Sequence, residues 1–326
     1  MISLKSLIAA AALSCLATLA QGQAQVVAIA TNAPGSLGYS VAAALAGVMQ
    51  QKANIATRVV PTSGSNSYAP MINRGDYEYG LLNSIDVLNA YTGVDNFKGH
   101  KNPDLRLAGV IFPLQNGIAV PNDSPAKSLK DLKGMRMPSV MTAQVTALVI
   151  QDAVLAAGGL SIADMKGVPV SDQFKGIAAL GDGKVDAALA CFTCAAAKEA
   201  DIALAAHGGM RFLPIPDTPE ALAAMRKVFP SARSQVFSPS PAFTGIAVPT
   251  RLFVHSSFLV VNKNVSDDVV YKTLKAIHEN KAALVASSAA MRGFDPDFMA
   301  EANTVPYHPG AEKFYKEIGQ WPPKSR

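Results

Sequence analysis

The chain alternates short apolar segments with polar, glycine-rich loops and helical patterns, and the first such unit is the clearest. Residues 26–30 are uniformly apolar, which is typical of a buried parallel strand. The loop at 31–40 follows, and the apolar residues after it have the spacing of one helix face. Such a loop can present the free N–H groups of a helix start to an anion or a polar atom, or serve as an ordinary strand-to-helix turn.

The same alternation continues in two series along the chain. Short apolar runs separated by polar loops and helices predict an α/β fold with mainly parallel sheets. Residues 73–76 before one run resemble residues 181–184 before another, which indicates two similar halves. The predicted strands are 58–60, 79–82 and 105–112, then 135–138, 168–170 and 185–190, then 253–262, followed by one long helix over 266–291.

Residues 1–24 have the features of an export signal. Lys5 provides the positive charge, residues 7–19 are apolar, and a small-x-small site precedes Gln25. We expect cleavage near Ala24 and a mature protein in the periplasm. Acylation of Cys15 as a lipoprotein is an alternative that the surrounding residues fit poorly.

Composition narrows the function classes. The chain has 326 residues, of which 49% are hydrophobic and 16% charged, so it can bury a large core and form two domains. Its formal net charge of +5 comes from scattered basic residues that do not interleave with aromatic ones. This pattern disfavours nucleic-acid binding. No segment after the signal is long and apolar enough to predict a membrane span.

Two cysteines remain after the signal, Cys191 and Cys194, in a Cys-x-x-Cys pattern. An exported protein can oxidise such a pair. A zinc site would need a second pair of ligands, and none follows nearby. The pattern therefore leaves a local disulfide, two quiet thiols or a redox pair as alternatives.

The order and spacing of several motifs resemble the TAXI-type solute receptors of TRAP transporters, which are periplasmic binding proteins of tripartite secondary transport. The similarity covers nearly all of the mature chain, and the C-terminal His-Pro-Gly-Ala at 308–311 is its most specific part. The other matching segments are 34–39, 61–65, 74–76, 83–84, 90–91, 131–134 and 183–187.

This resemblance implies a two-lobed, type II periplasmic-binding-protein fold, with a cleft between two α/β domains joined by hinge strands. Lobe I would comprise 25–118 and 250–326, and lobe II would comprise 119–249. The implied function is not enzymatic and needs no cofactor or metal. The protein would capture a small carboxylate-type solute, an organic acid or amino acid, by lobe closure and deliver it to a TRAP-type permease.

By the same analogy, the solute would contact the loops at the strand ends. For each of these residues, capping of its own helix or turn is the alternative. The predicted ligand-binding residues are Gly38, Tyr39, Ser40, Ser63, Gly64, Ser65, Asn83 and Ser84 in lobe I, and Thr142, Ala143, Gln144, Phe192 and Thr193 in lobe II.

The chain departs from the family pattern at two informative places. Residues 139–142 replace the usual glycine-serine-glycine loop, and Ile85 replaces a common acidic residue after Asn83-Ser84. The first change removes the glycines that let the backbone approach a ligand closely, and the second removes a charge. Both changes disfavour glutamate-like amino acids and dicarboxylates. A less polar organic acid would fit Met141, Ile85 and Phe192 better.

Two other function classes compete with this interpretation. An exported hydrolase would need a G-x-S-x-G nucleophile and a paired histidine, and neither Ser36 nor Ser65 lies in that motif. His308, before a proline at a helix start, is expected to shape that turn. A receptor for an ABC importer or a sensor is the closer alternative, because the same fold serves all three.

Overall fold

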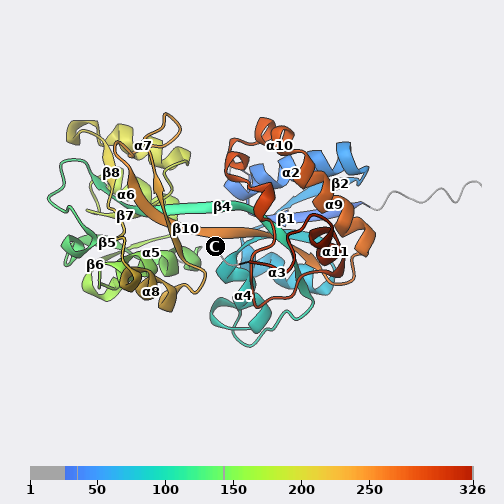
Figure 1. The fold of residues 1–326 in the computed structure, drawn as a ribbon. Helices are drawn as coiled ribbons and strands as arrows, with labels where there is room; N and C mark the ends of the chain where they lie inside the picture. Colours follow the sequence, from blue (N-terminus) through green and yellow to red (C-terminus); the bar gives the residue numbers. More distant parts are fainter. Residues whose placement is uncertain (1–25, 35, 142–143, 325–326) are drawn as a thin grey trace, which may run out of the picture.

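The computed structural model describes residues 26–34, 36–141 and 144–324, which form two lobes joined by two long strands (Figure 1). These strands are β4 (Leu105–Pro121) and β10 (Thr250–Asn262), and they pair antiparallel along their length. In Figure 1, lobe I lies on the right and lobe II on the left. The predicted two-lobed α/β class is confirmed. The expectation of mainly parallel sheets is wrong, because both long strands run antiparallel to every strand with which they pair.

The sheet of lobe I has the strand order β2-β1-β3-β10-β4. Strands β1 (Val27–Thr31), β2 (Thr57–Pro61) and β3 (Tyr79–Asn83) are mutually parallel, whereas β10 runs against β3. All five residues of β1 are buried, which explains its uniformly apolar start.

Helices cover both faces of this sheet. One apolar core joins the sheet to α2 (Leu37–Ala53), α9 (Asp267–Glu279), α10 (Lys281–Ser287) and α11 (Pro309–Glu317). A second core, on the other face, involves α3 (Ser65–Arg74) and α4 (Ser84–Thr92). Short 3₁₀ turns lie at Asp95–Phe97, Ala289–Gly293 and Pro296–Phe298.

Lobe II is built on the far halves of the two long strands. Strands β7 (Ala188–Ala190) and β8 (Met210–Phe212) pair with β4, and β9 (Arg233–Phe237) pairs with β10. Strands β5 (Arg136–Met141) and β6 (Lys166–Val170) form a parallel pair. The helices are α5 (Val145–Ala157), α6 (Gln173–Gly181), α7 (Ala195–Ala203) and α8 (Pro219–Val228), with 3₁₀ turns at Leu129–Leu132, Ile162–Asp164 and Ala205–His207.

The single helix predicted over 266–291 is wrong. The chain instead forms α9 and α10 with a break at Asn280, where φ is −123° and ψ is 37°. The Asn280 side chain donates to the Ala276 carbonyl oxygen at 2.8 Å. Asparagine side chains compete in this way with the backbone ladder of a helix, and the apolar periodicity does not reveal it.

The crossing between the lobes is visible in the strand partners. Residues of β10 up to Val254 pair with β9 of lobe II, and residues from Ser257 onward pair with β3 of lobe I. Pro113 of β4, which has no N–H to donate, lies opposite Ser256, and the register shifts between Ser257 and Phe258. A second register shift follows between Leu259 and Val260, so the pairing is irregular from the crossing into lobe I. The exact lobe boundaries, at 118/119 and 249/250, remain a prediction.

No helix in the described ranges combines the length and apolarity of a membrane span. This observation concerns those residues alone.

His255 lies on β10 at the crossing and is 1% exposed. Its ring packs against Phe229 and Phe253, with centroids 5.1 and 5.6 Å away, and neither ring nitrogen has a hydrogen-bond partner in the described part of the chain. Burial, reinforced by the charge of Arg233, lowers the pKa of His255 to about 3. The imidazole is therefore neutral in the folded protein.

This burial predicts an acid-dependent loss of stability. Because the pKa of His255 is lower in the folded than in the unfolded chain, the unfolded state binds the extra proton as the pH falls below about 6.5. The loss of unfolding free energy between pH 7 and pH 4.5 should be smaller by about 2 to 3 kcal/mol in His255→Phe than in the wild type. Chemical denaturation at both pH values measures it. His100→Gln, at an exposed histidine, is the control, and equal losses in the wild type and His255→Phe would contradict the expectation.

Candidate functional site

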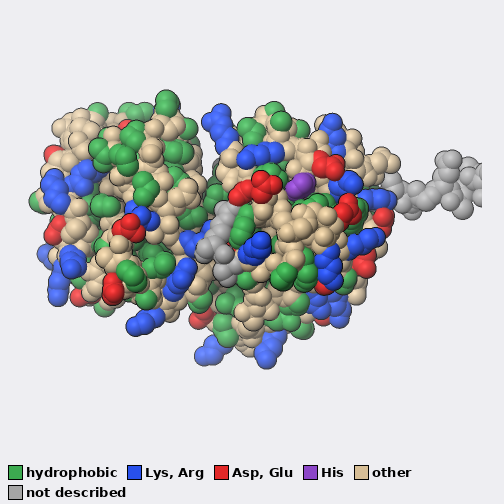
Figure 2. All heavy atoms as spheres, in the orientation of Figure 1, with side chains coloured by type: hydrophobic (Ala, Val, Ile, Leu, Met, Phe, Trp, Pro, Cys, Tyr) green, Lys and Arg blue, Asp and Glu red, His purple; other side chains and the backbone are tan. Residues whose placement is uncertain are grey.

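Three strand-to-helix junctions meet at one edge of lobe I. The parallel strands β1, β2 and β3 end there, and α2, α3 and α4 begin immediately after them. The carboxyl edge of a parallel sheet is the usual position of a binding crevice in open α/β folds. Every predicted lobe I residue, from Gly38 to Ser84, lies at one of these junctions. Figure 2 shows the outline of the molecule indented between the lobes.

The first junction holds Gly38, Tyr39 and Ser40. The Ser36 hydroxyl caps α2 by accepting from the Tyr39 N–H at 3.1 Å, and Ser40 Oγ lies 3.0 Å from Ser288 Oγ. Gly38 passes over Thr31, since a Cβ at position 38 would lie 2.8 Å from Thr31 Oγ1. That hydroxyl is buried and has no hydrogen-bond partner among the described residues. The first turn of α2 contains no acidic residue.

The second junction holds Ser63, Gly64 and Ser65. It is tied to the first, because the Thr62 N–H donates to the Thr31 carbonyl oxygen at 2.8 Å. Gly64 begins α3 with a φ of 154°, a value that favours glycine. No side chain caps α3 and no acid lies in its first turn. Its first N–H groups therefore suit an anion or a polar atom.

The third junction brings predicted residues of two loops onto one carboxylate. Ser65 Oγ and Asn83 Nδ2 donate to Asp86 Oδ2 at 2.7 and 2.8 Å. Across the lobes, Thr146 Oγ1 at the start of α5 donates to Asp86 Oδ1 at 2.6 Å. Asp86 thus joins lobe I loops to lobe II.

Asp86 was missed by the sequence analysis. The substitution at Ile85 was interpreted as the loss of a charge, which is wrong, because the carboxylate lies one residue further on. Asp86 is 4% exposed, and burial raises its pKa while the donated hydrogen bonds oppose that rise. An Asn-x-x-Asp pattern at a helix start signals a cap, and the Asn83 side chain does accept from the Asp86 N–H at 2.9 Å. No sequence pattern near Asp86 or Thr146 predicts the contact between them.

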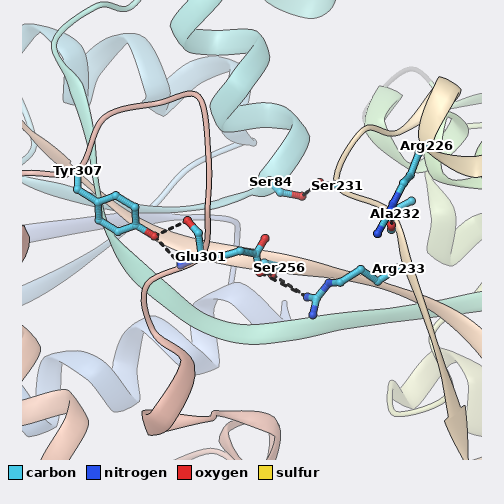
Figure 3. A network of polar contacts seen from close by, with 8 residues as sticks. All are labelled: Ser84, Arg226, Ser231, Ala232, Arg233, Ser256, Glu301 and Tyr307. Carbon is cyan, nitrogen blue, oxygen red and sulfur yellow. Dashed lines mark hydrogen bonds and ion pairs between the residues drawn. The ribbon is translucent and has the colours of Figure 1, made fainter. Parts of the chain in front are cut away.

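The two residues before Asp86 also contact lobe II. Ser84 Oγ lies 2.7 Å from Ser231 Oγ, a contact drawn in Figure 3. The Ile85 side chain belongs to the apolar core of lobe II. The first turn of α4 therefore packs against the opposite lobe with three consecutive residues.

Lobe II contributes a second polar chain. The Gln144 side-chain oxygen accepts from the Gln173 N–H at 3.0 Å, and Gln173 Nε2 donates to Asn116 Oδ1 of β4 at 2.8 Å. These contacts place the starts of α5 and α6 side by side, next to the crossing strands. Thr142 and Ala143 lie outside the described residues.

Phe192 and Thr193 follow β7. Phe192 is fully buried, with its ring centroid 4.7 Å from that of Phe237 and 5.1 Å from that of Phe243, so the ring packs within the lobe core. Thr193 is exposed. Cys191 and Cys194 on either side form a disulfide, with their Cα atoms 5.6 Å apart.

The apolar residues expected to favour a less polar acid are not exposed. Met141, Ile85 and Phe192 are all core residues. Exposed apolar side chains instead occur where helices begin: Leu37 opens α2, Val145 opens α5 and Phe174 lies in the first turn of α6, with exposures of 40%, 45% and 40%.

The described ranges contain no group of three or more histidine, cysteine, aspartate or glutamate side chains that could hold a metal ion. His308 caps α11 by accepting from the Gly310 N–H at 3.1 Å, which confirms its predicted role in that turn.

Comparison with known proteins gives a family and a fold. The model of the NMT1-like family matches residues 29–319. A structure described as a periplasmic transporter is 15% identical over 92% of this chain and 94% of its own, with a TM-score of 0.55. PhnD1 from Prochlorococcus marinus (MIT 9301), solved with methylphosphonate, is 11% identical over 91% of this chain and 100% of its own, with a TM-score of 0.54. A TctC solute-binding protein from Polaromonas is 13% identical over 84% and 91%, also with a TM-score of 0.54.

The disulfide beside Phe192 should contribute little to stability. It closes a loop of only four residues, from Cys191 to Cys194, so its removal should lower the free energy of unfolding by about 2 kcal/mol or less. Denaturation of the Cys191→Ser/Cys194→Ser variant measures this. As a control, a reductant should not change the variant further. Alkylation of both wild-type cysteines without prior reduction would contradict the bond.

Proposed function

This chain belongs to the NMT1-like family, and we propose that it is an exported solute-binding protein that captures a small organic acid between its lobes. The observation that carries the proposal is the convergence of three strand-to-helix junctions of lobe I on the start of α5 in lobe II, through Asp86. Ligands of two-lobed proteins lie in such a crevice, and the role is one of binding rather than catalysis.

The described structural neighbours support this function class. PhnD1 was solved with methylphosphonate, and another neighbour is named as a solute-binding protein. We propose that this chain likewise acts outside the cytoplasmic membrane, in the periplasm, after removal of the predicted signal near Ala24.

The polar edge of lobe I favours an anionic group. The first turn of α2 carries no acid, so the partial positive charge of this helix start favours an anion. The start of α3 also lacks an acid of its own, but there the Asp86 carboxylate accepts from Ser65. The Thr31 hydroxyl, buried below Gly38, has no hydrogen-bond partner among the described residues and adds a polar group at the same place. An unpaired buried hydroxyl costs free energy, which a nearby polar ligand atom or water can offset.

The rest of the solute is proposed to be apolar. Leu37, Val145 and Phe174 are half-exposed at the starts of α2, α5 and α6, and we propose that they line the solute site. An apolar body placed against them would remove their surface from water, at about 25 cal/mol per Å². The predicted contacts of Gly38, Ser63, Ser65, Asn83, Gln144 and Thr193 with solute remain part of this proposal.

The transport partner is proposed from the motif resemblance. We infer a TRAP-type permease of the TAXI class as the recipient of the solute, with an ABC importer or a sensor as the alternative. The neighbouring genes discriminate between them, because a TRAP system encodes a many-span permease and an ABC importer encodes an ATPase.

A chain-length series tests the solute class. Straight-chain carboxylates from acetate to octanoate should bind with Kd values that fall about fourfold per added CH₂ group, because each buried group contributes about 0.8 kcal/mol. Calorimetric titration of the mature protein measures this, with glutamate and succinate as polar comparisons.

The variant Phe174→Ser should weaken octanoate binding by about tenfold while leaving acetate unchanged, because it removes apolar wall only. Ile202→Ser is the matched control, because Ile202 is an exposed apolar residue near the C-terminal end of α7. Tighter binding of glutamate or succinate than of octanoate would exclude the apolar body. Failure of every carboxylate and amino acid to bind would count against solute capture itself.

A further inference from the structure

We propose that Asp86 is a positioning residue that clasps the two lobes together and fixes the geometry of the solute loops in the closed form. The clasp stands on the contacts of this chain alone, whereas its meaning for solute capture rests on the proposed function. The clasp comprises Ser84, Ile85 and Asp86 of lobe I with Ser231 and Thr146 of lobe II.

The carboxylate divides its two oxygens between the lobes. Oδ2 accepts from Ser65 and Asn83, which belong to two of the lobe I junctions. Oδ1 accepts from Thr146, two residues after Gln144 and next to the exposed Val145. One side chain therefore sets the distance between predicted solute loops on opposite walls of the crevice.

Burial makes this contact selective for one closed geometry. Asp86 is 4% exposed, so closing the lobes removes water from its carboxyl group. Only an arrangement that brings the Thr146 hydroxyl to Oδ1 replaces the lost hydration, and hydrogen bonds to charged groups are among the stronger ones. A lobe that closes at another angle leaves the carboxylate without that donor. Asp86 thereby favours one closed form over partly closed ones.

The other lobe I residues of the clasp also contact lobe II. Ile85 inserts an apolar side chain into the core of lobe II, and Ser84 meets Ser231. Figure 3 shows Ser231 in one segment with Ala232 and Arg233, and Arg226 of α8 beside Ala232. Arg226 Nε donates to the Ala232 carbonyl oxygen at 3.0 Å.

The far end of this segment is anchored to lobe I. Arg233 donates to Ser256 Oγ at 2.9 Å, and Ser256 Oγ donates to Glu301 Oε2 at 2.5 Å. The Tyr307 hydroxyl holds the Glu301 backbone through two 2.8 Å contacts. The segment from Ser231 to Arg233 thus contacts lobe I at α4 and at the C-terminal region. These two contacts hold in position the lobe II residue that meets Ser84.

The test is small-angle scattering of the mature protein without added solute. Thr146→Val keeps the side-chain shape and removes only the donor from lobe II. It should shift the open-to-closed ratio about tenfold or more toward open, seen as a larger radius of gyration than that of the wild type. Asp86→Asn should act in the same direction, because an amide oxygen alone cannot accept from all these donors.

Thr92→Val is the matched control. The Thr92 hydroxyl donates to the Leu88 carbonyl oxygen within α4 at 2.7 Å, so its loss removes one hydrogen bond without touching lobe II. Its radius of gyration should equal that of the wild type. A Thr146→Val radius equal to that of the wild type, or a wild type already as expanded as the variant, would overturn the clasp. Either result leaves the carboxylate titrations unaffected, so the two proposals can fail separately.

Discussion

The pairing of β4 with β10 is the constraint on which the architecture depends. Both strands run through the two lobes within one eight-stranded sheet, so each lobe completes its core with residues from a strand that begins in the other. The pair holds the lobes together, yet its register shifts between Ser257 and Phe258 and again between Leu259 and Val260. Two strands with irregular pairing permit bending where a continuous sheet would resist it. The lobes can therefore be stable bodies with an adjustable separation.

Apart from the β4–β10 pair, a few contacts between the lobes set that separation. On one side Asp86 and Ile85 contact lobe II, and on the other Arg233 reaches Ser256 and Glu301. Polar groups dominate both contacts, and polar contacts exchange with water at small net gain. Closure balanced in this way responds to a bound solute, because a modest difference in affinity between the two forms suffices to shift their populations.

Apolar runs predicted the strands of lobe I, because a buried parallel strand such as β1 must be apolar throughout. Strands β8 and β9 of lobe II were missed, since the first has only three residues and the second is mostly not buried. Chain order also placed Ser65 and Asn83 at one sheet edge. The break at Asn280 was not predictable, since a side-chain bond to Ala276 decides it. Phe192 was expected at a strand tip as a contact residue, yet tertiary packing buries its ring among Phe237 and its neighbours. The pair of Asp86 and Thr146 depends on lobe placement, which local pattern does not encode.

The distribution of acidic residues connects these findings. Helices α8, α9 and α11 carry Glu220, Asp267 and Glu312 in their first turns, which compensates their dipoles. The first turns of α2, α3 and α5 have no acid of their own, and neither do those of α6, α7 and α10. The carboxylate of Asp86, however, accepts from Ser65 in the first turn of α3 and from Thr146 in the first turn of α5. At α4 the acid is present, but donors from both lobes occupy it. The buried carboxylate of Asp86 thus lies at the first turns of α3, α4 and α5 and joins the two lobes, and the start of α2, which has no acid in its first turn, is the one of these four that favours an anionic solute group.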